Sequence, residues 1–257
     1  MDYRIAIPSH NRPNDQITFE YLLSQGFSPL DIDVFVSSSE QAELYRACNP
    51  KMDNIIIGKL GMKEIRNFIT DYYPTDVKYV SFDDDIKEVR MKNPKEWEES
   101  SFADPDELDL DEEIKLAFSE CEKSGRRMFG VYPVENHYFM KNQITYDYKF
   151  ACGGLFGVIN EKSLKIKLDQ YEDYDRCIQE YLSYGGIVRL NYLCLKTPKM
   201  GKNEGGMSDE RDFVGDLIKL QDLYPFLVNT KIKKGTGLLN PVLKDTRPHP
   251  TMSGPGL

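Results

Sequence analysis

The first 83 residues alternate between short apolar runs and polar stretches, and this alternation constrains the fold more than any other feature. Four runs rich in β-branched and aromatic residues are typical of strands, and the stretches between them have helical patterns. A succession of this kind predicts a parallel sheet with right-handed crossovers. We expect strands near residues 4–7, 31–36, 54–57 and 77–83, and helices near 15–24, 39–47 and 63–73.

The rest of the chain continues the mixture of helices and strands. Residues 91–110 are polar and acidic, which indicates a surface excursion. We predict one α/β domain over residues 1–240, with a Rossmann-like, mostly parallel sheet flanked by helices. An irregular tail is expected over residues 241–257, in a region rich in Lys, Gly and Pro. Further helices are expected over 111–123, 173–182 and 210–224, and further strands over 128–132, 150–159 and 187–195.

Composition narrows the class of protein. No apolar run approaches the roughly 20 residues that span a bilayer, and the first residues lack an apolar region of signal-peptide length. Five cysteines without metal-site spacing predict reduced thiols and a cytoplasmic location. The net charge is −9, which does not favour nucleic-acid binding. Residues 151–257 carry 15 Lys and Arg against 13 Asp and Glu, so any polyanion contact is expected there.

Three consecutive aspartates end the fourth apolar run. Ligands bind beyond the carboxyl ends of strands in open α/β sheets, and Asp83 to Asp85 would lie there. Alternate side chains of an extended chain share a face, so Asp83 and Asp85 can point the same way. Two hard oxygen ligands beside a diphosphate suit Mg²⁺ or Mn²⁺. The alternative interpretation is a solvated acidic turn.

Two segments before the aspartates are candidates for binding a nucleotide. The polar loop of Pro8, Ser9, His10, Asn11 and Arg12 leaves the first strand at its carboxyl end, although an ordinary turn would have the same pattern. Arg66 and Asn67 lie on the helix before the aspartates, where an arginine can bind phosphate bidentately. An exposed helical arginine is the equally acceptable alternative.

A second acidic pair, Glu172 and Asp173, opens a predicted helix. Asp173 could act as a general base toward an acceptor hydroxyl. A carboxylate at this position is also favoured by helix capping and the helix dipole. Gly153 and Gly154 lie upstream, and their lack of a side chain would let a sugar approach the backbone.

Other polar residues have weaker assignments. His249, between prolines, is a candidate third metal ligand but more typical of a disordered end. Aromatic residues over 132–150 could stack on bases. Nine lysines are candidates for contacting nucleic acid, although solvated lysines of a soluble protein would look the same: Lys162, Lys165, Lys167, Lys196, Lys199, Lys202, Lys231, Lys233 and Lys234.

Several of these segments together resemble a known family. In order, Ile7–Pro13, Arg66–Ile69, Phe82–Ile86 and Glu172–Tyr174 resemble a GT-A glycosyltransferase. Four further segments, at 130–134, 138–141, 156–160 and 203–207, make the chain similar to the TET-associated glycosyltransferases of bacteriophages. The similarity covers about residues 3–230. That family in turn resembles the glucosyltransferase that completes base J in kinetoplastid DNA.

The resemblance implies a GT-A fold and a metal-dependent hexosyltransferase. The expected donor is a nucleotide sugar, and specifically a UDP-sugar. The expected acceptor is the hydroxymethyl group of a 5-hydroxymethylpyrimidine in DNA. Asp83 and Asp85 match the metal-binding DxD motif, and Asp173 with Glu172 matches the catalytic carboxylate. The donor side is expected to include Pro8, Ser9, His10, Asn11, Arg12, Arg66, Asn67, Asp83, Asp84, Gly153 and Gly154. A GT-A transferase acting on a polysaccharide or protein, and a nucleotidyltransferase, stay open as alternatives.

Overall fold

A nine-stranded sheet forms the centre of the molecule. The computed structural model describes residues 2–94, 101–198, 213–232 and 239–248. The strand order is β3-β2-β1-β4-β8-β6-β9-β5, with β7 paired to β9. The sheet strands are β1 (Arg4–Pro8), β2 (Ile32–Val36), β3 (Asn54–Ile57), β4 (Lys78–Phe82), β5 (Glu88–Met91), β6 (Met128–Tyr132), β7 (Ile144–Thr145), β8 (Leu155–Ile159) and β9 (Val188–Lys196).

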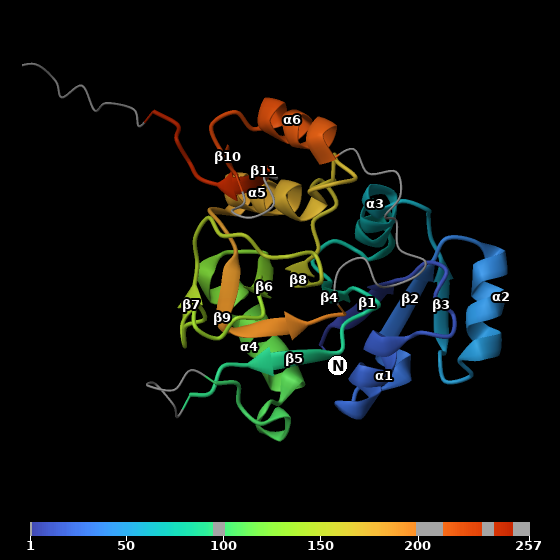
Figure 1. Ribbon diagram of the computed structural model, residues 1–257. Helices are drawn as coiled ribbons and strands as arrows, with labels where there is room; N and C mark the ends of the chain where they lie inside the picture. Colours follow the sequence, from blue (N-terminus) through green and yellow to red (C-terminus); the bar gives the residue numbers. More distant parts are fainter. Residues whose placement is uncertain (1, 95–100, 199–212, 233–238, 249–257) are drawn as a thin grey trace, which may run out of the picture.

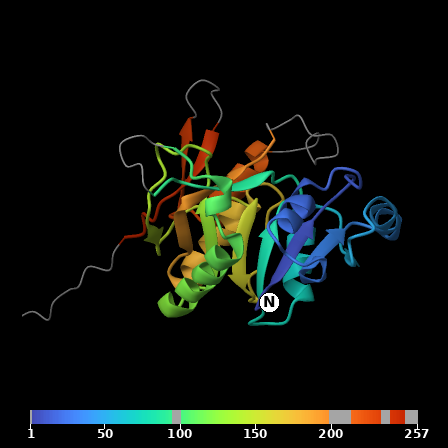
Figure 2. The same cartoon turned by 90° about the horizontal axis from the view of Figure 1, so that it is seen from below.

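Helices cover both faces of this sheet, so the predicted α/β class is confirmed (Figure 1). Helices α1, α2 and α4 pack on one face and α3 and α5 on the other. Figure 2 shows the same layers after a quarter turn. The described helices are α1 (Ile17–Ser24), α2 (Ser39–Cys48), α3 (Met62–Tyr72), α4 (Leu110–Ser124), α5 (Glu172–Tyr184) and α6 (Phe213–Leu223), with short 3-10 turns at Pro29–Asp31 and Pro105–Glu107.

Alternation along the strands explains the two cores. In β1, Ile5 and Ile7 face the core beneath α1, α2 and α4, while Ala6 faces the core beneath α3 and α5. In β2, Val34 and Val36 share the first core and Phe35 lies in the second. Both faces of these central strands are buried, which is why the sequence shows continuous apolar runs there.

Strand direction places several carboxyl ends at one edge of the sheet. Strands β3, β2, β1 and β4 are mutually parallel. Strand β8 is antiparallel to both β4 and β6, so β6 runs in the same direction as β4, and β9 is parallel to β6. Six of the nine strands therefore point one way, and β5, β7 and β8 point the other. The ends of β1, β4 and β6 consequently lie at the same edge.

The C-terminal region differs from the sequence prediction. Strands β10 (Val228–Ile232) and β11 (Leu239–Leu243) form an antiparallel pair, so an irregular tail from residue 241 is wrong for 241–243. Their inward side chains join a third core with Leu220 of α6 and Ile178 of α5, whose burial stabilises the pair. The polar excursion at 91–110 was also placed too broadly, because α4 already begins at Leu110 and residue 91 belongs to β5.

Two expectations from composition can be compared with the structure. Within the described ranges, no helix combines the length and apolarity needed to cross a membrane. All five cysteines are free thiols, and Cys121, Cys177 and Cys194 are buried.

Candidate functional site

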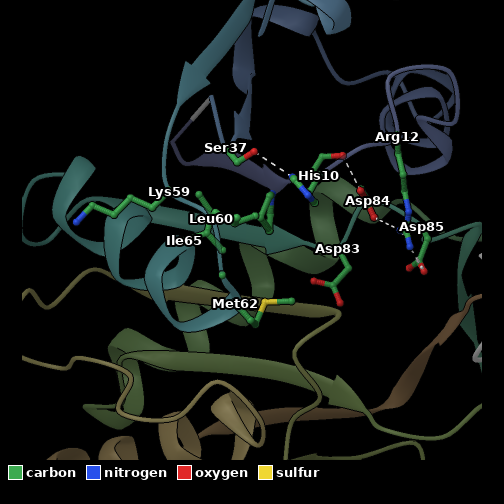
Figure 3. A pocket seen from close by; sticks show the side chains of 13 residues that line it. His10, Arg12, Ser37, Lys59, Leu60, Met62, Ile65, Asp83, Asp84 and Asp85 are labelled. Carbon is green, nitrogen blue, oxygen red and sulfur yellow. Dashed lines mark hydrogen bonds and ion pairs between the residues drawn. The ribbon is translucent and has the colours of Figure 1, made fainter. Parts of the chain in front are cut away.

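A pocket of about 210 Å³ lies at the carboxyl edge of β1 and β4 (Figure 3). The loop after β1, the start of α3 and the three aspartates after β4 form its walls. Its position agrees with the expectation that ligands bind beyond strand ends in α/β sheets. The lining residues are Pro8, Ser9, His10, Arg12, Ser37, Lys59, Leu60, Gly61, Met62, Ile65, Asp83, Asp84 and Asp85.

Asp84 fixes the loop that follows β1. Its buried carboxylate accepts hydrogen bonds from Ser9 Oγ at 2.5 Å and from Arg12 Nη1. Tyr45 of α2 holds the same loop, because its hydroxyl contacts Ser9 Oγ at 2.7 Å and accepts from Arg12 N at 3.0 Å. Burial raises the pKa of Asp84 to about 6 against the opposing effects of Ser9 and Arg12. The Asp84 carboxylate therefore serves mainly to shape the wall of the pocket.

His10 and Asn11 are held in different ways. The Nδ1 atom of His10 contacts Ser37 Oγ at 3.0 Å at the pocket wall, and burial lowers the pKa of His10. Asn11 lies outside the pocket lining and exchanges hydrogen bonds with Gln41 of α2, including Gln41 Nε2 to Asn11 Oδ1 at 2.8 Å. Its φ of 56° is a left-handed conformation that asparagine tolerates. Asn11 thus connects the loop to α2.

Asp83 and Asp85 both line the pocket, although the predicted reason was wrong. Strand β4 ends at Phe82 and a turn follows, so the alternation of an extended chain no longer applies. Figure 3 shows the Asp83 carboxylate directed away from Arg12, whereas Asp85 lies beside it. The Asp85 Oδ2 atom is 3.7 Å from Arg12 Nη1.

Asp83 and Asp85 carry the oxygen ligands that Mg²⁺ and Mn²⁺ prefer, although each lies beside an arginine, Asp83 beside Arg66 and Asp85 beside Arg12. Their side chains are 35% and 29% exposed, so each carboxylate is partly accessible to solvent. Among the described residues, no three His, Cys, Asp or Glu side chains are grouped to hold a metal. Magnesium is usually held by one or two carboxylates together with substrate phosphates, so a two-carboxylate site is compatible with such an ion. His249 lies outside the described residues.

Arg66 connects the pocket with the second acidic pair. Its side chain is buried, and its guanidinium donates to Asp83 Oδ1 at 2.6 Å, to Ser81 Oγ at 2.6 Å and to Gly153 O at 3.0 Å. The alternative of an exposed helical arginine is therefore excluded. Arg66 does not line the pocket, and its expected contact with the donor phosphates stays a prediction. A buried arginine stays charged because Asp83 and Glu172 offset its desolvation and raise its pKa.

Glu172 and Asp173 begin α5 on the far side of Arg66. They line a separate small cavity of about 10 Å³ rather than the pocket, and both side chains are partly exposed. Asp173 accepts hydrogen bonds from Gly153 N at 3.4 Å and from Tyr174 N at 2.9 Å. Burial raises the pKa of Asp173 well above its ordinary value, and the neighbouring Glu172 raises it further. Burial also raises the pKa of Glu172 despite the opposing charge of Arg66.

Gly153, Gly154 and Asn67, all expected on the donor side, do not line the pocket and instead make contacts within the protein. A Cβ on Gly153 would lie 2.8 Å from Glu172 Oε1, and one on Gly154 would lie 2.8 Å from Leu195 Cδ1. The carbonyl of Gly154 accepts from Asp83 N at 2.9 Å, which holds Asp83 at its position. Asn67, predicted on the donor side, instead exchanges two hydrogen bonds with the backbone of Ile166.

The sequence prediction missed the wall formed by the start of α3. Lys59, Leu60, Gly61 and Met62 line the pocket there. Gly61 precedes the helix with a φ of 105°, and the Asp169 carboxylate accepts a hydrogen bond from Lys63 N in the first turn at 3.4 Å. Backbone N–H groups at such a helix start favour anions. The pair Gly58 and Gly61 between a strand and a helix was the signal that could have identified this wall.

The predicted lysine surface is mostly engaged in contacts within the protein. Lys165 pairs with Asp71, Lys167 Nζ lies 3.2 Å from the Tyr224 hydroxyl, and Lys196 Nζ lies 3.1 Å from Glu88 Oε2. Lys162 is exposed, as predicted for a solvated lysine. Lys199, Lys202, Lys233 and Lys234 lie outside the described residues, as does the segment 203–207.

Comparison with known proteins leaves the family open. No protein-family model matches the chain, and no curated protein matches it significantly. Among solved structures, it is similar to CMP:2-keto-3-deoxy-manno-octonic acid synthetase complexed with CTP, with 9% identity and a TM-score of 0.40 over 87% of this chain and 98% of that one. A similarity of this degree decides neither family nor activity, so membership of the bacteriophage family stays a prediction.

Proposed function

We propose that this protein is a metal-dependent glycosyltransferase that uses a nucleotide sugar. The observation that carries the proposal is the position of Arg66, which joins Asp83 at the pocket to Gly153 beside Asp173. One buried cation thus holds together a strand-end carboxylate suited to a metal and a helix-start carboxylate suited to a base. Sugar transfer from a nucleotide requires both functions on adjoining sides of the reacting carbon.

The pocket would receive the nucleoside part of the donor. Its volume of about 210 Å³ is below the roughly 300–1,000 Å³ of pockets that enclose a drug-sized ligand, so it would hold only part of a nucleotide sugar. The apolar side chains of Leu60, Met62 and Ile65 and the polar groups of Ser37 and His10 suit a base and ribose. The diphosphate would then lie toward Asp83 and Asp85.

Asp173 would take the proton of the acceptor hydroxyl. Its raised pKa makes it a stronger base than an ordinary aspartate, and its two backbone hydrogen bonds fix its orientation. A divalent ion held by Asp83 and Asp85 would neutralise charge on the departing diphosphate. For the acceptor we propose the hydroxymethyl group of a 5-hydroxymethylpyrimidine in DNA, a choice that rests on the sequence resemblance.

A nucleotidyltransferase is the second candidate, and one observation favours it. Asp173 and Glu172 do not line the pocket that contains Asp83 and Asp85. Chemistry at a nucleotide α-phosphate would need the pocket and its carboxylates but no base on α5. The two candidates release different products, because a nucleotidyltransferase forms pyrophosphate and a glycosyltransferase forms a nucleoside diphosphate.

One experiment measures both the modified nucleoside and the phosphate product that is released. The protein is incubated with Mn²⁺, UDP-sugars and DNA containing 5-hydroxymethylcytosine, and nucleosides are analysed by mass spectrometry alongside the released phosphates. We expect a nucleoside with one added hexose and stoichiometric UDP. The Asp173→Asn variant should lose transfer by about 10²–10⁴-fold, the range of general-base catalysis, while Asp71→Asn on the surface of α3 should not. Pyrophosphate release from a nucleoside triphosphate, with no hexose added from any donor, would establish the second candidate instead.

A further inference from the structure

One wall of the pocket carries a series of hydrogen bonds that ends at the hydroxyl of Ser37. Ser37 directly follows β2, and His10 lies on the loop after β1. The hydrogen bond from Ser9 N to Phe35 O, at 2.9 Å, fastens that loop to β2. Ser37 and His10 both line the pocket, and Figure 3 shows the contact of 3.0 Å between His10 Nδ1 and Ser37 Oγ.

The direction of every bond in this series follows from one backbone N–H group. The N–H of Asn11 can only donate, and it donates to Gln41 Oε1 at 3.0 Å. Gln41 therefore turns its amide nitrogen toward Asn11, where Nε2 donates to Oδ1 at 2.8 Å. The amide nitrogen of Asn11 is left facing His10 Nε2 at 2.9 Å, and it can only donate. His10 Nε2 is thus an acceptor and carries no proton.

His10 consequently has the tautomer that makes Ser37 a donor toward the pocket. A neutral imidazole holds its proton on the nitrogen that does not accept, so His10 Nδ1–H donates to Ser37 Oγ. Burial lowers the pKa of His10, which favours the neutral ring above pH 7. The Ser37 oxygen is then occupied as an acceptor of this bond, and its own proton points away from His10. Ser37 therefore presents a hydrogen-bond donor at the pocket wall.

Ser37 lies at the end of the pocket away from the acidic residues. Strand β1 separates β2 from β4, so the ends of β2 and β4 are two strand spacings, roughly 9–10 Å, apart. Figure 3 shows Ser37 on the left, with Leu60 and Ile65, and Asp85 on the right. With the proposed diphosphate position beside Asp83 and Asp85, the base is the part of the nucleotide that reaches Ser37.

We propose that the Ser37 hydroxyl donates a hydrogen bond to a keto oxygen of the bound nucleotide's base, so that the pocket selects a keto base, as in uracil, over an amino base, as in cytosine. The inference rests on the proposed function, because it takes the pocket as the site of the nucleoside. An amino group in the same place would set one donor against another and leave both without a partner. His10, Asn11 and Gln41 are positioning residues, because they keep Ser37 in the donor role.

The first test compares UDP with CDP, which differ only at the edge of the base, by titration calorimetry with Mg²⁺ at pH 8. We expect UDP to bind at least about tenfold more tightly than CDP. Ser37→Ala should weaken UDP binding and bring the two affinities to within about threefold of each other. Ser37→Thr keeps the hydroxyl and should keep the preference. Ser39→Ala, at the exposed start of α2, is the matched control and should bind both nucleotides like the unchanged protein.

The second test measures the tautomer of His10 by ¹⁵N nuclear magnetic resonance at the same pH. The protein has three histidines, so His10→Gln identifies the His10 signals after selective labelling. The proton should lie on Nδ1. Asn11→Asp replaces the donor to Nε2 with a carboxylate that can only accept, so the proton should move to Nε2 and Ser37 should donate to Nδ1. The preference for UDP should then be lost. Asn14→Asp adds the same charge at an exposed position of the loop and should change neither the tautomer nor the preference.

These binding measurements do not depend on sugar transfer, so the inference and the proposed function can fail separately. A proton on His10 Nε2 in the unchanged protein, or a preference for UDP that survives in Ser37→Ala, would overturn the inference. A protein that prefers UDP through Ser37 but adds no hexose to any acceptor would refute the proposed function alone. Hexose transfer by Ser37→Ala with an unchanged preference for UDP-sugars over CDP-sugars would refute the inference alone.

Discussion

Asp83, Asp84 and Asp85 are neighbours in the chain, but the fold gives each a different environment. Asp83 pairs with buried Arg66, Asp84 is buried against Ser9 and Arg12, and Asp85 lies partly exposed beside Arg12. We therefore expect Asp83→Asn and Asp85→Asn to abolish the enhancement of UDP binding by Mn²⁺, measured by titration calorimetry with EDTA as the metal-free reference. Asparagine keeps an oxygen that can accept the Arg66 hydrogen bond, so both variants should fold.

Asp84→Ala should behave differently from its neighbours. It removes the acceptor for Ser9 and Arg12 inside the protein, so we expect the free energy of unfolding to fall by about 1–3 kcal/mol in urea denaturation. Asp85→Ala, at a partly exposed position, should change it by less than about 0.5 kcal/mol. Equal losses of stability for the two alanine variants would contradict the structural role assigned to Asp84.

Arg66 provides the third prediction at this scale. Removing one member of a fully buried ion pair costs about 3–5 kcal/mol, because the partner stays buried without compensation. Asp83 is 35% exposed, so Arg66→Leu should cost less, about 2–3 kcal/mol, in the same denaturation measurement. Arg46→Leu on the exposed face of α2 is the matched control, with an expected change below about 0.5 kcal/mol. If Arg66→Leu left the free energy of unfolding unchanged, Arg66 would not hold the two acidic regions together.

Sequence patterns located the individual side chains better than they assigned their contacts. The strand before Asp83 and the helix that contains Arg66 were both predicted, since period and composition determine them locally. The internal use of Asp84 and Asn67 could not be predicted. Their partners, Ser9 and Ile166, are 75 and 99 residues away along the chain, and only the folded sheet brings them close.

At the scale of elements, β8 shows what periodicity cannot decide. Alternation is the same in a strand of either direction, so the sequence predicted a strand over 150–159 without indicating that it runs antiparallel to β4 and β6. The observed strand is also shorter, Leu155–Ile159, because residues 150–154 form the turn beside Arg66. Strands β10 and β11 were missed because the region from residue 231 to 257 is rich in Lys, Gly and Pro, which is typical of loops.

The pairing of β6 with β8 depends on a glycine. Gly157 lies opposite Phe129, and a Cβ at Gly157 would lie 2.0 Å from the Phe129 ring. Gly157→Ala should therefore lower the free energy of unfolding by about 1–3 kcal/mol through overpacking. Combining it with Phe129→Leu, which vacates this space, should cost at least about 1 kcal/mol less than the sum of the single changes.

The measurement is a double-mutant cycle by urea denaturation, with a second cycle as its control. Phe19 lies on α1 in the core on the same face, and it is absent from the neighbours that a Cβ at Gly157 would meet. Phe19→Leu should thus be additive with Gly157→Ala within about 0.5 kcal/mol. Additivity in the Phe129 cycle would mean that the ring does not occupy the space above Gly157.

At the scale of the whole molecule, two buried acids should hold protons that the unfolded chain releases. Burial raises the pKa of Asp84 to about 6 and that of Glu180 to about 7. Such groups ionise near pH 4 in an unfolded chain. Between about pH 4 and pH 7 the native state therefore binds more protons, so the free energy of unfolding falls as pH rises.

Acids with lowered pKa values act in a different range. Hydrogen bonds and nearby cations outweigh burial at Glu88, Asp111 and Asp216, where the pKa is lowered. These three acids stabilise the fold at pH values above the pKa they have in the unfolded chain. That stabilisation is lost below about pH 4, as pH falls through their pKa values in the folded protein. The two groups together predict greatest stability near pH 4, where the unfolded carboxylates titrate. The net charge of −9 at pH 7 also favours greater stability at lower pH. Repulsion between like charges weakens as pH falls toward the isoelectric point of about 5.0.

We therefore expect the free energy of unfolding to be larger at pH 5.5 than at pH 7.5 by about 2 kcal/mol or more, measured by urea denaturation at both values. Glu180 should account for about 1–2 kcal/mol of this difference, because its side chain is only 2% exposed and its Oε2 has no hydrogen-bond partner. Glu180→Gln should remove that share, whereas Glu43→Gln on the exposed face of α2 should keep the full dependence. Stability that rises from pH 5.5 to pH 7.5 would mean that Glu180 and Asp84 are ionised throughout, and that solvent reaches carboxylates which the fold encloses.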